Sequence, residues 1–327
     1  MKENNKIQKA LDAASRPVSE GWIQRFFQVR ELPILLYIII MMVVFSISIN
    51  GFLAVKNFEN ISRQITTIGI VSVGMTLVIL TGGIDLSVGA MLSFAINIGG
   101  QGIVHGWPIW VVYPFMLLLG LALGLLNGFL VTRIAVPALI ITLGTMNIYR
   151  GILMVITKGR YITPIPSAYD ALGRGFIPFI IFAVILGLFI FITLRTRFGR
   201  NLFSIGGAEQ SALFSGVPVR RYKMIVYVIS GLLSALAGLI LIGKSGFIQP
   251  QAGTGYELNA IAAVVIGGTS IFGGSGSVLG TFLGSVLMGL ILAGLTMLAV
   301  NPYWIGLITG VLIILAIAVD SLRVLRR

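Results

Sequence analysis

The sequence predicts an all-α, polytopic membrane helix bundle of about ten transmembrane helices with both termini in the cytoplasm. Three observations predict it. Of 327 residues, 57% are hydrophobic and 10% are charged, whereas soluble globular proteins have about 25% charged residues. The hydrophobic residues form runs long enough to cross a bilayer. The basic residues lie between these runs and are unequally divided between the two predicted faces.

A helix needs about 20 apolar residues to cross the hydrocarbon core of a bilayer. We count ten candidate spans, which are roughly 33–55, 62–80, 84–104, 109–131, 138–157, 176–194, 223–243, 259–272, 278–299 and 303–319. The eighth is short and ends in the glycine-rich segment Gly273-Gly274-Ser275-Gly276. Its length is typical of a broken or re-entrant helix.

The first span begins after a polar segment of about 30 residues, which a secretory signal peptide does not have. We therefore interpret 33–55 as a retained helix. The chain divides into a cytoplasmic N-terminal segment at 1–32, a transmembrane domain at 33–319 and a cytoplasmic tail at 320–327.

Lysine and arginine set the predicted orientation, because loops on the cytoplasmic side carry an excess of them. With the N-terminus inside, the inner segments hold 16 basic residues and the outer segments hold six. Arg150 lies within a predicted span and is not assigned to a side. This bias places both termini inside.

Two loops are long. The outer one, 158–175, contains Pro164 and Pro166, and the inner one, 195–223, is the most polar internal segment. Within the inner loop, residues 208–214 have helical propensity and lie between glycines. We predict a short helix at the cytoplasmic face, and the alternative is a plain solvated connector.

The composition excludes several kinds of site. The absence of cysteine excludes disulfides, thiolate metal sites and cysteine nucleophiles, and the single histidine, His105, excludes a multi-histidine metal cluster. We find no catalytic set of side chains. The segment from Gly238 to Ser245 formally matches a phosphate-binding loop, but its interior is Leu-Ile-Leu-Ile within a predicted span, so we do not interpret it as a nucleotide site.

Glycines recur at every fourth position in two spans, at Gly120, Gly124 and Gly128 and again at Gly280 and Gly284. Small residues at this spacing let helix backbones approach closely in lipid. The pattern predicts tight helix packing and says nothing about function.

Ionisable and amide side chains within apolar spans are more informative, because burying them in a bilayer is costly. Asp85 follows a Gly-Gly pair, which favours a helix N-cap over direct substrate contact. Arg150 either extends to the interface or faces an aqueous path. The candidates for a translocation path are Asp85, Asn97, Asn127, Thr142, Asn147 and Arg150, although each amide or hydroxyl alone is more often structural.

Several long segments, in order, resemble one family. They are 75–89 (MTLVILTGGIDLSVG), 196–207 (TRFGRNLFSIGG) with 215–217, 252–274 (AGTGYELNAIAAVVIGGTSIFGG), 301–304 (NPYW) and 319–322 (VDSL). Together they resemble the permease subunits of bacterial ABC importers for monosaccharides, the ribose, xylose and galactose permease family. The resemblance covers nearly the whole chain from about residue 33.

The resemblance implies a mechanism. Such permeases work in pairs, as homodimers or related heterodimers, in the bacterial cytoplasmic (inner) membrane. A separate ABC ATPase subunit powers them, and a periplasmic or lipid-anchored binding protein delivers the sugar. The permease itself is a transport subunit and not an enzyme, and no cofactor or nucleic acid is implied.

The resemblance also makes the 195–223 loop the ATPase-coupling element. Family members usually read Gly-Gly-Asn-Glu-Ala-Ala, and in this chain Ala208 stands where they have Asn. The coupling residues carried over onto this chain are Gly206, Gly207, Glu209, Ala212, Ser215 and Gly216.

The sequence thus predicts the permease subunit of an ATP-driven monosaccharide importer. Ribose is the first expectation for the sugar, while the C-terminal segments 301–304 and 319–322 look more like galactose permeases. The alternatives are a stand-alone, ion-coupled secondary sugar transporter and a membrane scaffold or receptor without transport. Asp85 is the only acidic residue within the predicted spans, and this scarcity disfavours ion coupling.

Overall fold

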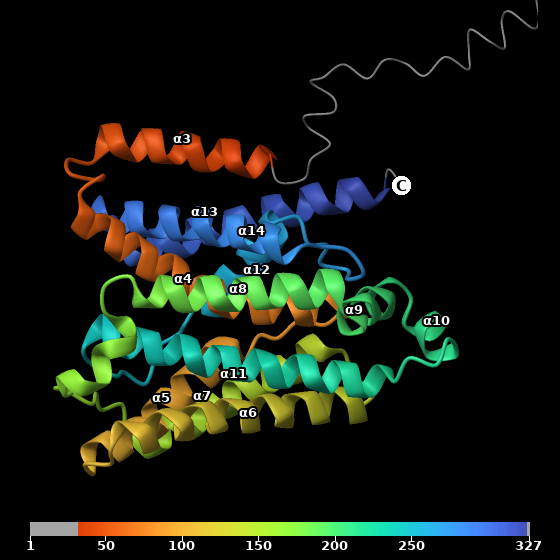
Figure 1. The fold of residues 1–327 in the computed structure, drawn as a ribbon, viewed down its shortest axis with the longest axis horizontal. Coiled ribbons are helices and arrows are strands. Elements are labelled where there is room, and N and C mark those ends of the chain that lie inside the picture. Colours follow the sequence, from red (N-terminus) through yellow and green to blue (C-terminus); the bar gives the residue numbers. More distant parts are fainter. Residues whose placement is uncertain (1–31, 326–327) are drawn as a thin grey trace, which may run out of the picture.

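The computed structural model describes residues 32–325 and is helical apart from its loops and one antiparallel bridge between Ile162 and Ile248. Figure 1 shows the helices running roughly parallel in one bundle. They are α3 (Leu32–Ser48), α4 (Val55–Leu80), α5 (Val88–Val104), α6 (Ile109–Arg133), α7 (Ala138–Thr157), the 3-10 helix η1 (Ser167–Gly173), α8 (Ile177–Arg195), α9 (Arg197–Gly207), α10 (Glu209–Phe214), α11 (Val219–Ser245), α12 (Tyr256–Ile266), α13 (Val278–Met297) and α14 (Pro302–Leu325).

The apolar helices fall on the ten predicted segments. Judged by length and composition alone, the described residues contain six helices that could cross a membrane. These are α4, α6, α7, α8, α11 and α13. Shorter apolar helices are α3, α5, α12 and the part of α14 from Gly306 to Leu315. The expected count of about ten is therefore not established by helix length.

Helix α12 is the shortest of the apolar helices Leu32–Ser48, Val88–Val104 and Tyr256–Ile266. It has 11 residues, which extend about 16 Å at 1.5 Å per residue, roughly half of the hydrocarbon core. Gly253 and Gly255 precede it and Gly268 follows it, all with positive φ, a conformation that glycine adopts without steric cost. The eighth segment is thus short, as predicted, but begins three residues earlier than expected.

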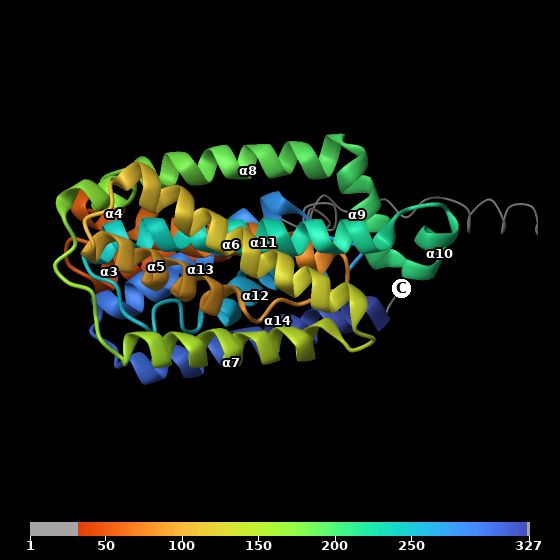
Figure 2. The same cartoon turned by 90° about the horizontal axis from the view of Figure 1, so that it is seen from below.

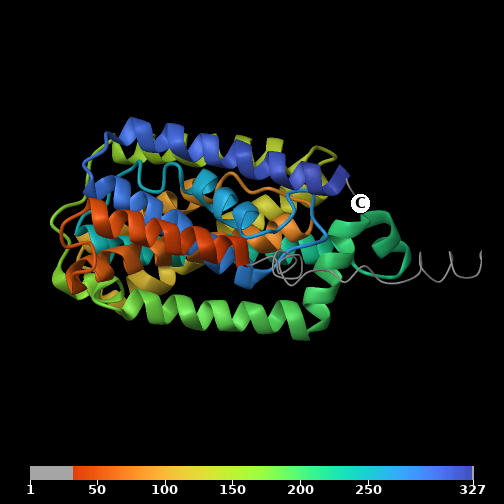
Figure 3. The ribbon, with the colours of Figure 1, turned by 90° about the horizontal axis from the view of Figure 1, so that it is seen from above.

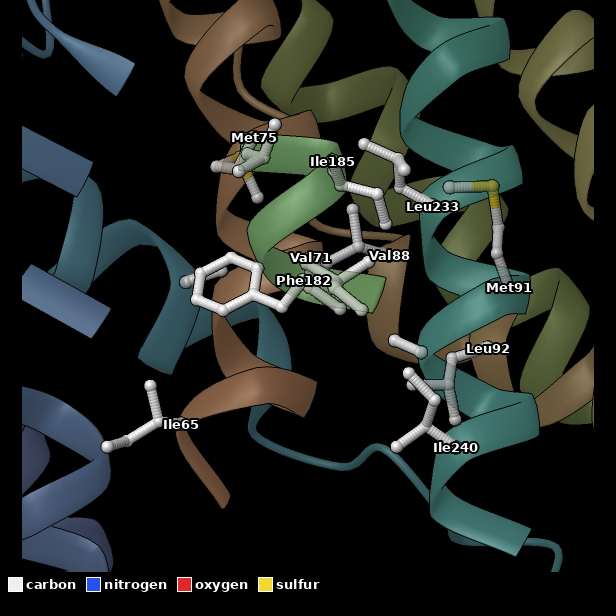
Figure 4. Close-up of a cluster of buried hydrophobic side chains, with 14 of the residues drawn as sticks. Ile65, Val71, Met75, Val88, Met91, Leu92, Phe182, Ile185, Leu233 and Ile240 are labelled. Atoms are coloured by element: carbon white, nitrogen blue, oxygen red, sulfur yellow. The ribbon is translucent and has the colours of Figure 1, made fainter. Parts of the chain in front are cut away.

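Helix α4 runs through the centre of the bundle, and most of its residues from Ile61 to Leu80 are buried. Helix α8 covers it from one side, where the Phe182 ring occupies the space above Gly69. Figure 4 shows Phe182 and Ile185 in one cluster with Val71 and Met75 of α4 and with side chains of α5 and α11. Figure 2 shows α7 and α8 at opposite sides of the bundle.

The spaced glycines make the close helix contacts that the sequence predicted. A Cβ atom on Gly120 or Gly124 would lie 2.5 or 2.4 Å from backbone oxygens of α11, and one on Gly280 or Gly284 would lie 2.0 or 1.9 Å from backbone oxygens of the α12 segment. Such distances leave no room for a side chain. Backbone-to-backbone packing therefore joins α6 to α11 and α12 to α13.

The start of α3, the end of α14, and helices α9 and α10 lie at the same end of the bundle in Figures 1 and 3. The loop of residues 158–176 lies at the opposite end. Helix α14 continues to Leu325, six residues beyond the expected end of the last span. The predicted cytoplasmic N-terminal segment, through residue 31, and residues 326–327 of the predicted tail lie outside the described residues.

Candidate functional site

The inner 195–223 loop folds into two helices, of which sequence analysis predicted one. Helix α10 (Glu209–Phe214) is the short helix expected at 208–214, whereas α9 (Arg197–Gly207) was not predicted. The Thr196 side chain caps α9 by accepting a hydrogen bond from the Gly199 N–H at 3.3 Å.

The two glycines that end α9 differ in their surroundings. A Cβ atom on Gly206 would lie 1.9 Å from the Leu80 carbonyl oxygen and 2.4 Å from the Gly274 nitrogen, whereas one on Gly207 would meet nothing within 4 Å. The Gly274 N–H also donates to the Leu80 carbonyl at 3.2 Å. The end of α9 therefore touches the last residue of α4 and the loop after α12 at one point.

Helix α10 is held against α11. Ala212 is buried with Ile205 and Val219 in a small apolar cluster, and the Lys223 ammonium donates to the Glu209 carboxylate at 2.7 Å. The side chain of Glu209 is 55% exposed, which leaves it accessible at the end of the bundle. Ser215 and Gly216 end the helix, Ser215 by donating to the Ser211 carbonyl and Gly216 by its positive φ.

Asp85 does not cap α5, contrary to the preferred reading of the sequence. The N-cap residue is Ser87, and its side chain makes no capping hydrogen bond to the helix. Instead, the Asp85 carboxylate accepts hydrogen bonds from the Ser87 N–H at 3.0 Å, the Ser87 hydroxyl at 2.6 Å and the Ser230 hydroxyl at 3.0 Å. Asp85 lies two residues before the N-cap position, so its carboxylate bonds to the N-cap residue itself.

A chain of hydrogen bonds extends from this carboxylate to α7. The Asn127 amide donates to the Ser87 hydroxyl at 2.6 Å, and the Tyr149 hydroxyl donates to the Asn127 carbonyl oxygen at 2.9 Å. Asp85, Ser87 and Asn127 are fully buried. The structure thus brings two of the candidate residues together, in a network that joins α6, α7 and α11 through the loop of residues 81–87.

Of the other candidates, Thr142 adjoins this network and the rest are separate from it. Thr142 holds the same loop, because its hydroxyl donates to the Ile84 carbonyl and accepts from the Leu86 N–H. Asn97 is buried and donates to the Gln249 carbonyl at 3.0 Å, in the loop before α12. Asn147 is exposed and donates to a carbonyl of its own helix.

Arg150 pairs with a residue that sequence analysis did not single out. One guanidinium nitrogen lies 3.8 Å from the carboxylate of Glu257, and another donates to the Thr254 hydroxyl at 2.8 Å. Glu257 was placed outside the eighth span because that span was predicted to begin at 259. One signal in the sequence could have drawn attention to Glu257: it lies in 252–274, one of the segments that carry the family resemblance.

Two cavities lie at opposite ends of the bundle. One of about 680 Å³ is lined by residues of the 156–166 region, including Lys158 and Arg160. The other, of about 290 Å³, lies between the loop of residues 81–84 and the start of α7, with Lys223 and Tyr227 in its wall. Lys223 therefore connects the second cavity with Glu209 of α10.

The segment resembling a phosphate-binding loop, 238–245, is helical and lies within α11, as the interpretation of that pattern required. Among the described residues, no group of three or more His, Cys, Asp or Glu side chains is placed to hold a metal ion.

Comparison with known proteins gives consistent matches. The family model described as branched-chain amino acid transport system / permease component matches residues 57–317. Curated relatives include the ribose import permease proteins of Haemophilus influenzae, 39% identical over 87% of this chain and 91% of the relative, and of Bacillus subtilis, 40% identical over 86% and 89%.

The xylose transport system permease protein of Escherichia coli K12 is 34% identical over 87% of this chain and 90% of the relative. No solved structure matches the chain. The chain has several helices long and apolar enough to span a membrane. Because the family model covers most of the chain and these relatives align over nearly their whole length, this multi-pass membrane protein belongs to the family of transport-system permease components.

Proposed function

We propose that this protein is the permease subunit of an ATP-driven importer that carries a monosaccharide, with ribose as the first candidate. The observation that carries this proposal is the similarity to ribose and xylose permeases over 86–87% of the chain. Ribose ranks first because those relatives are 39% and 40% identical, against 34% for the xylose permease.

The topology follows from this proposal. Ten segments cross the membrane in the permease domain, 33–319, the eighth as the short helix α12 together with the loop that precedes it. The domain lies in the bacterial cytoplasmic membrane, and both termini lie in the cytoplasm. The start of α3 and the end of α14 lie at the same end of the bundle as α9 and α10, which supports an even number of crossings. The excess of basic residues in the segments at that end supports its cytoplasmic orientation.

ATP hydrolysis occurs on a separate subunit, which docks on α9 and α10. The exposed Glu209 carboxylate and the contact of Gly206 with Leu80 and Gly274 support this role. A displacement of α9 would reach the end of α4 and the loop after α12 through backbone contacts. An extracytoplasmic binding protein delivers the sugar at the opposite end, and a second permease, identical or related, completes the path.

The test is co-purification in mild detergent, followed by reconstitution of the recovered complex into vesicles. We expect an ATP-binding subunit near equal stoichiometry and an ATPase activity stimulated by sugar-loaded binding protein. If the chain is recovered alone and moves ribose or xylose with an ion gradient and without ATP, it is a secondary transporter and the proposal is wrong. If no sugar moves under either condition, the substrate class is wrong.

A further inference from the structure

A small cavity lies beside the N-terminus of α12. It has a volume of about 210 Å³, and its polar and aromatic lining consists of Ser245, Phe247, Gln249, Gln251, Thr254 and Tyr256. Pockets for drug-sized ligands have volumes of about 300–1,000 Å³, so this cavity suits a smaller molecule. Amide and hydroxyl groups both donate and accept hydrogen bonds, which matches the many hydroxyl groups of a monosaccharide.

Thr254 connects this cavity to a charged pair. Its hydroxyl accepts from the Arg150 guanidinium at 2.8 Å and donates to the Gln251 carbonyl at 2.7 Å. The same guanidinium lies 3.8 Å from Glu257. Arg150 is thirteenth of the 20 residues of α7, about 18 Å along a helix of about 30 Å. The pair therefore lies near the middle of α7, with the Arg150 side chain 23% exposed. In the proposed topology this is a depth in the membrane at which ionisable residues are costly unless they serve a purpose.

The hydrogen bonding of this pair is incomplete. The Arg150 Nη2 and Glu257 Oε2 atoms are buried and have no hydrogen-bond partner among the described residues, and Glu257 is only 9% exposed. Its other oxygen, Oε1, accepts from the Gly255 N–H at 3.3 Å. Buried donors and acceptors in folded proteins are almost always paired. One hydroxyl group can accept from a guanidinium and donate to a carboxylate.

The separation of the two charges argues against a purely structural role. Ion pairs that hold elements together by charge-assisted hydrogen bonds have N–O distances of about 2.7–2.9 Å, and the 3.8 Å between Arg150 and Glu257 is longer. The guanidinium makes its short contact with the cavity residue Thr254 instead.

We propose that Arg150, Thr254 and Glu257, with the adjoining cavity, form a hydroxyl-binding site for the monosaccharide within the permease. This inference rests on the proposed function and specifies where the sugar is recognised after the binding protein has released it. Arg150 donates to a sugar hydroxyl, Glu257 accepts from it, and Thr254 sets the position of the guanidinium.

The test uses the purified permease in lipid nanodiscs and measures binding of D-ribose and D-xylose by saturation-transfer NMR. Thr254→Val removes the hydroxyl at nearly constant shape, and Thr254→Ser retains it. We expect Thr254→Val and Glu257→Gln to weaken binding about tenfold, since one hydrogen bond to a charged group contributes at least that factor. Thr254→Ser should bind within about twofold of the unmodified protein.

The matched control is Glu59→Gln, which removes the charge of an Arg–Glu pair in α4, away from the cavity. Equal binding by Thr254→Val and Thr254→Ser, or by Glu257→Gln and Glu59→Gln, would overturn the inference, as would the absence of saturable sugar binding. ATP-dependent uptake by the unmodified reconstituted transporter separates this failure from failure of the proposed function. If Glu257→Gln does not fold, the two Thr254 variants decide.

Discussion

At the scale of single residues, the polar groups inside the bundle divide by how completely they are bonded. Asp85 accepts three hydrogen bonds from two serines and is fully buried. Arg150 and Glu257 each retain an unpartnered atom. A group whose hydrogen bonds are satisfied within the protein has little remaining capacity to bond to a substrate. Asp85 is therefore expected to stabilise the fold, and the Arg150–Glu257 pair to meet the sugar.

We predict that Asp85→Asn lowers stability without changing sugar preference. The substituted amide offers one acceptor oxygen in place of two, so a hydroxyl of Ser87 or Ser230 loses its acceptor. Leaving such a buried group unsatisfied costs about 1–3 kcal/mol. Thermal unfolding in detergent measures the loss, with the exposed Asn147→Ala as control. Normal stability together with a changed ratio of ribose to xylose uptake would show that Asp85 contacts substrate.

At the scale of elements, α9 contacts the rest of the bundle through backbone atoms at Gly206. Gly206 lies against Leu80, the last residue of α4, and against Gly274 in the loop after α12. Close-packed contacts transmit displacement because protein interiors are dense and resist compression. We therefore expect a displacement of α9 to reach the end of α4 and the loop after α12 from one point at the end of the bundle.

Adjacent glycines provide a matched test of this contact. Gly206→Ala places a methyl group in contact with backbone atoms, which costs about 1–3 kcal/mol of overpacking, whereas Gly207→Ala meets open space. We expect Gly206→Ala to reduce ATP-dependent uptake at least several-fold and Gly207→Ala to retain most of it. Equal uptake by both variants would contradict a role for this contact in coupling.

Charge reversal at Glu209 tests docking separately. The pair with Lys223 is half-exposed, and such pairs contribute about 0–1 kcal/mol to stability. Glu209→Lys should therefore leave membrane insertion and thermal stability near normal while it lowers sugar uptake and the amount of ATPase subunit recovered. Unchanged uptake, with the ATPase still bound, would remove Glu209 from the coupling mechanism.

At the scale of the whole molecule, the two ends of the bundle differ in the number of basic residues in their segments and in the helices and loops that they carry. One end carries α9, α10 and the start and end of the described chain, and the other carries the loop with Lys158 and the cavity of about 680 Å³. A protein that passes solute in one direction needs such a distinction, because different partners act on the two faces.

The absence of cysteine allows a direct test of orientation. We predict that Ser211→Cys, in α10, reacts with a membrane-impermeant maleimide only from the cytoplasmic side, and Lys158→Cys only from the outside. Intact cells and inside-out vesicles give the two measurements. Labelling of both cysteines from one side would contradict the proposed topology.

The sequence alone determined the class of the molecule, because apolar runs, charge bias and glycine spacing are local properties that the bilayer selects directly. It located the apolar segments, the helix at 208–214 and the close packing at Gly120, Gly124, Gly280 and Gly284. The family also followed from ordered segments of sequence. None of these required knowledge of which helices are neighbours.

The tertiary structure decided what the polar residues touch. Asp85 bonds to Ser230, 145 positions away, and Arg150 bonds to Thr254, 104 positions away, and no periodicity in one segment encodes such pairings. The structure also moved the start of α12 to Tyr256, which put Glu257 inside the bundle. The roles of these residues depend on packing between distant helices, and sequence patterns report only on each helix by itself.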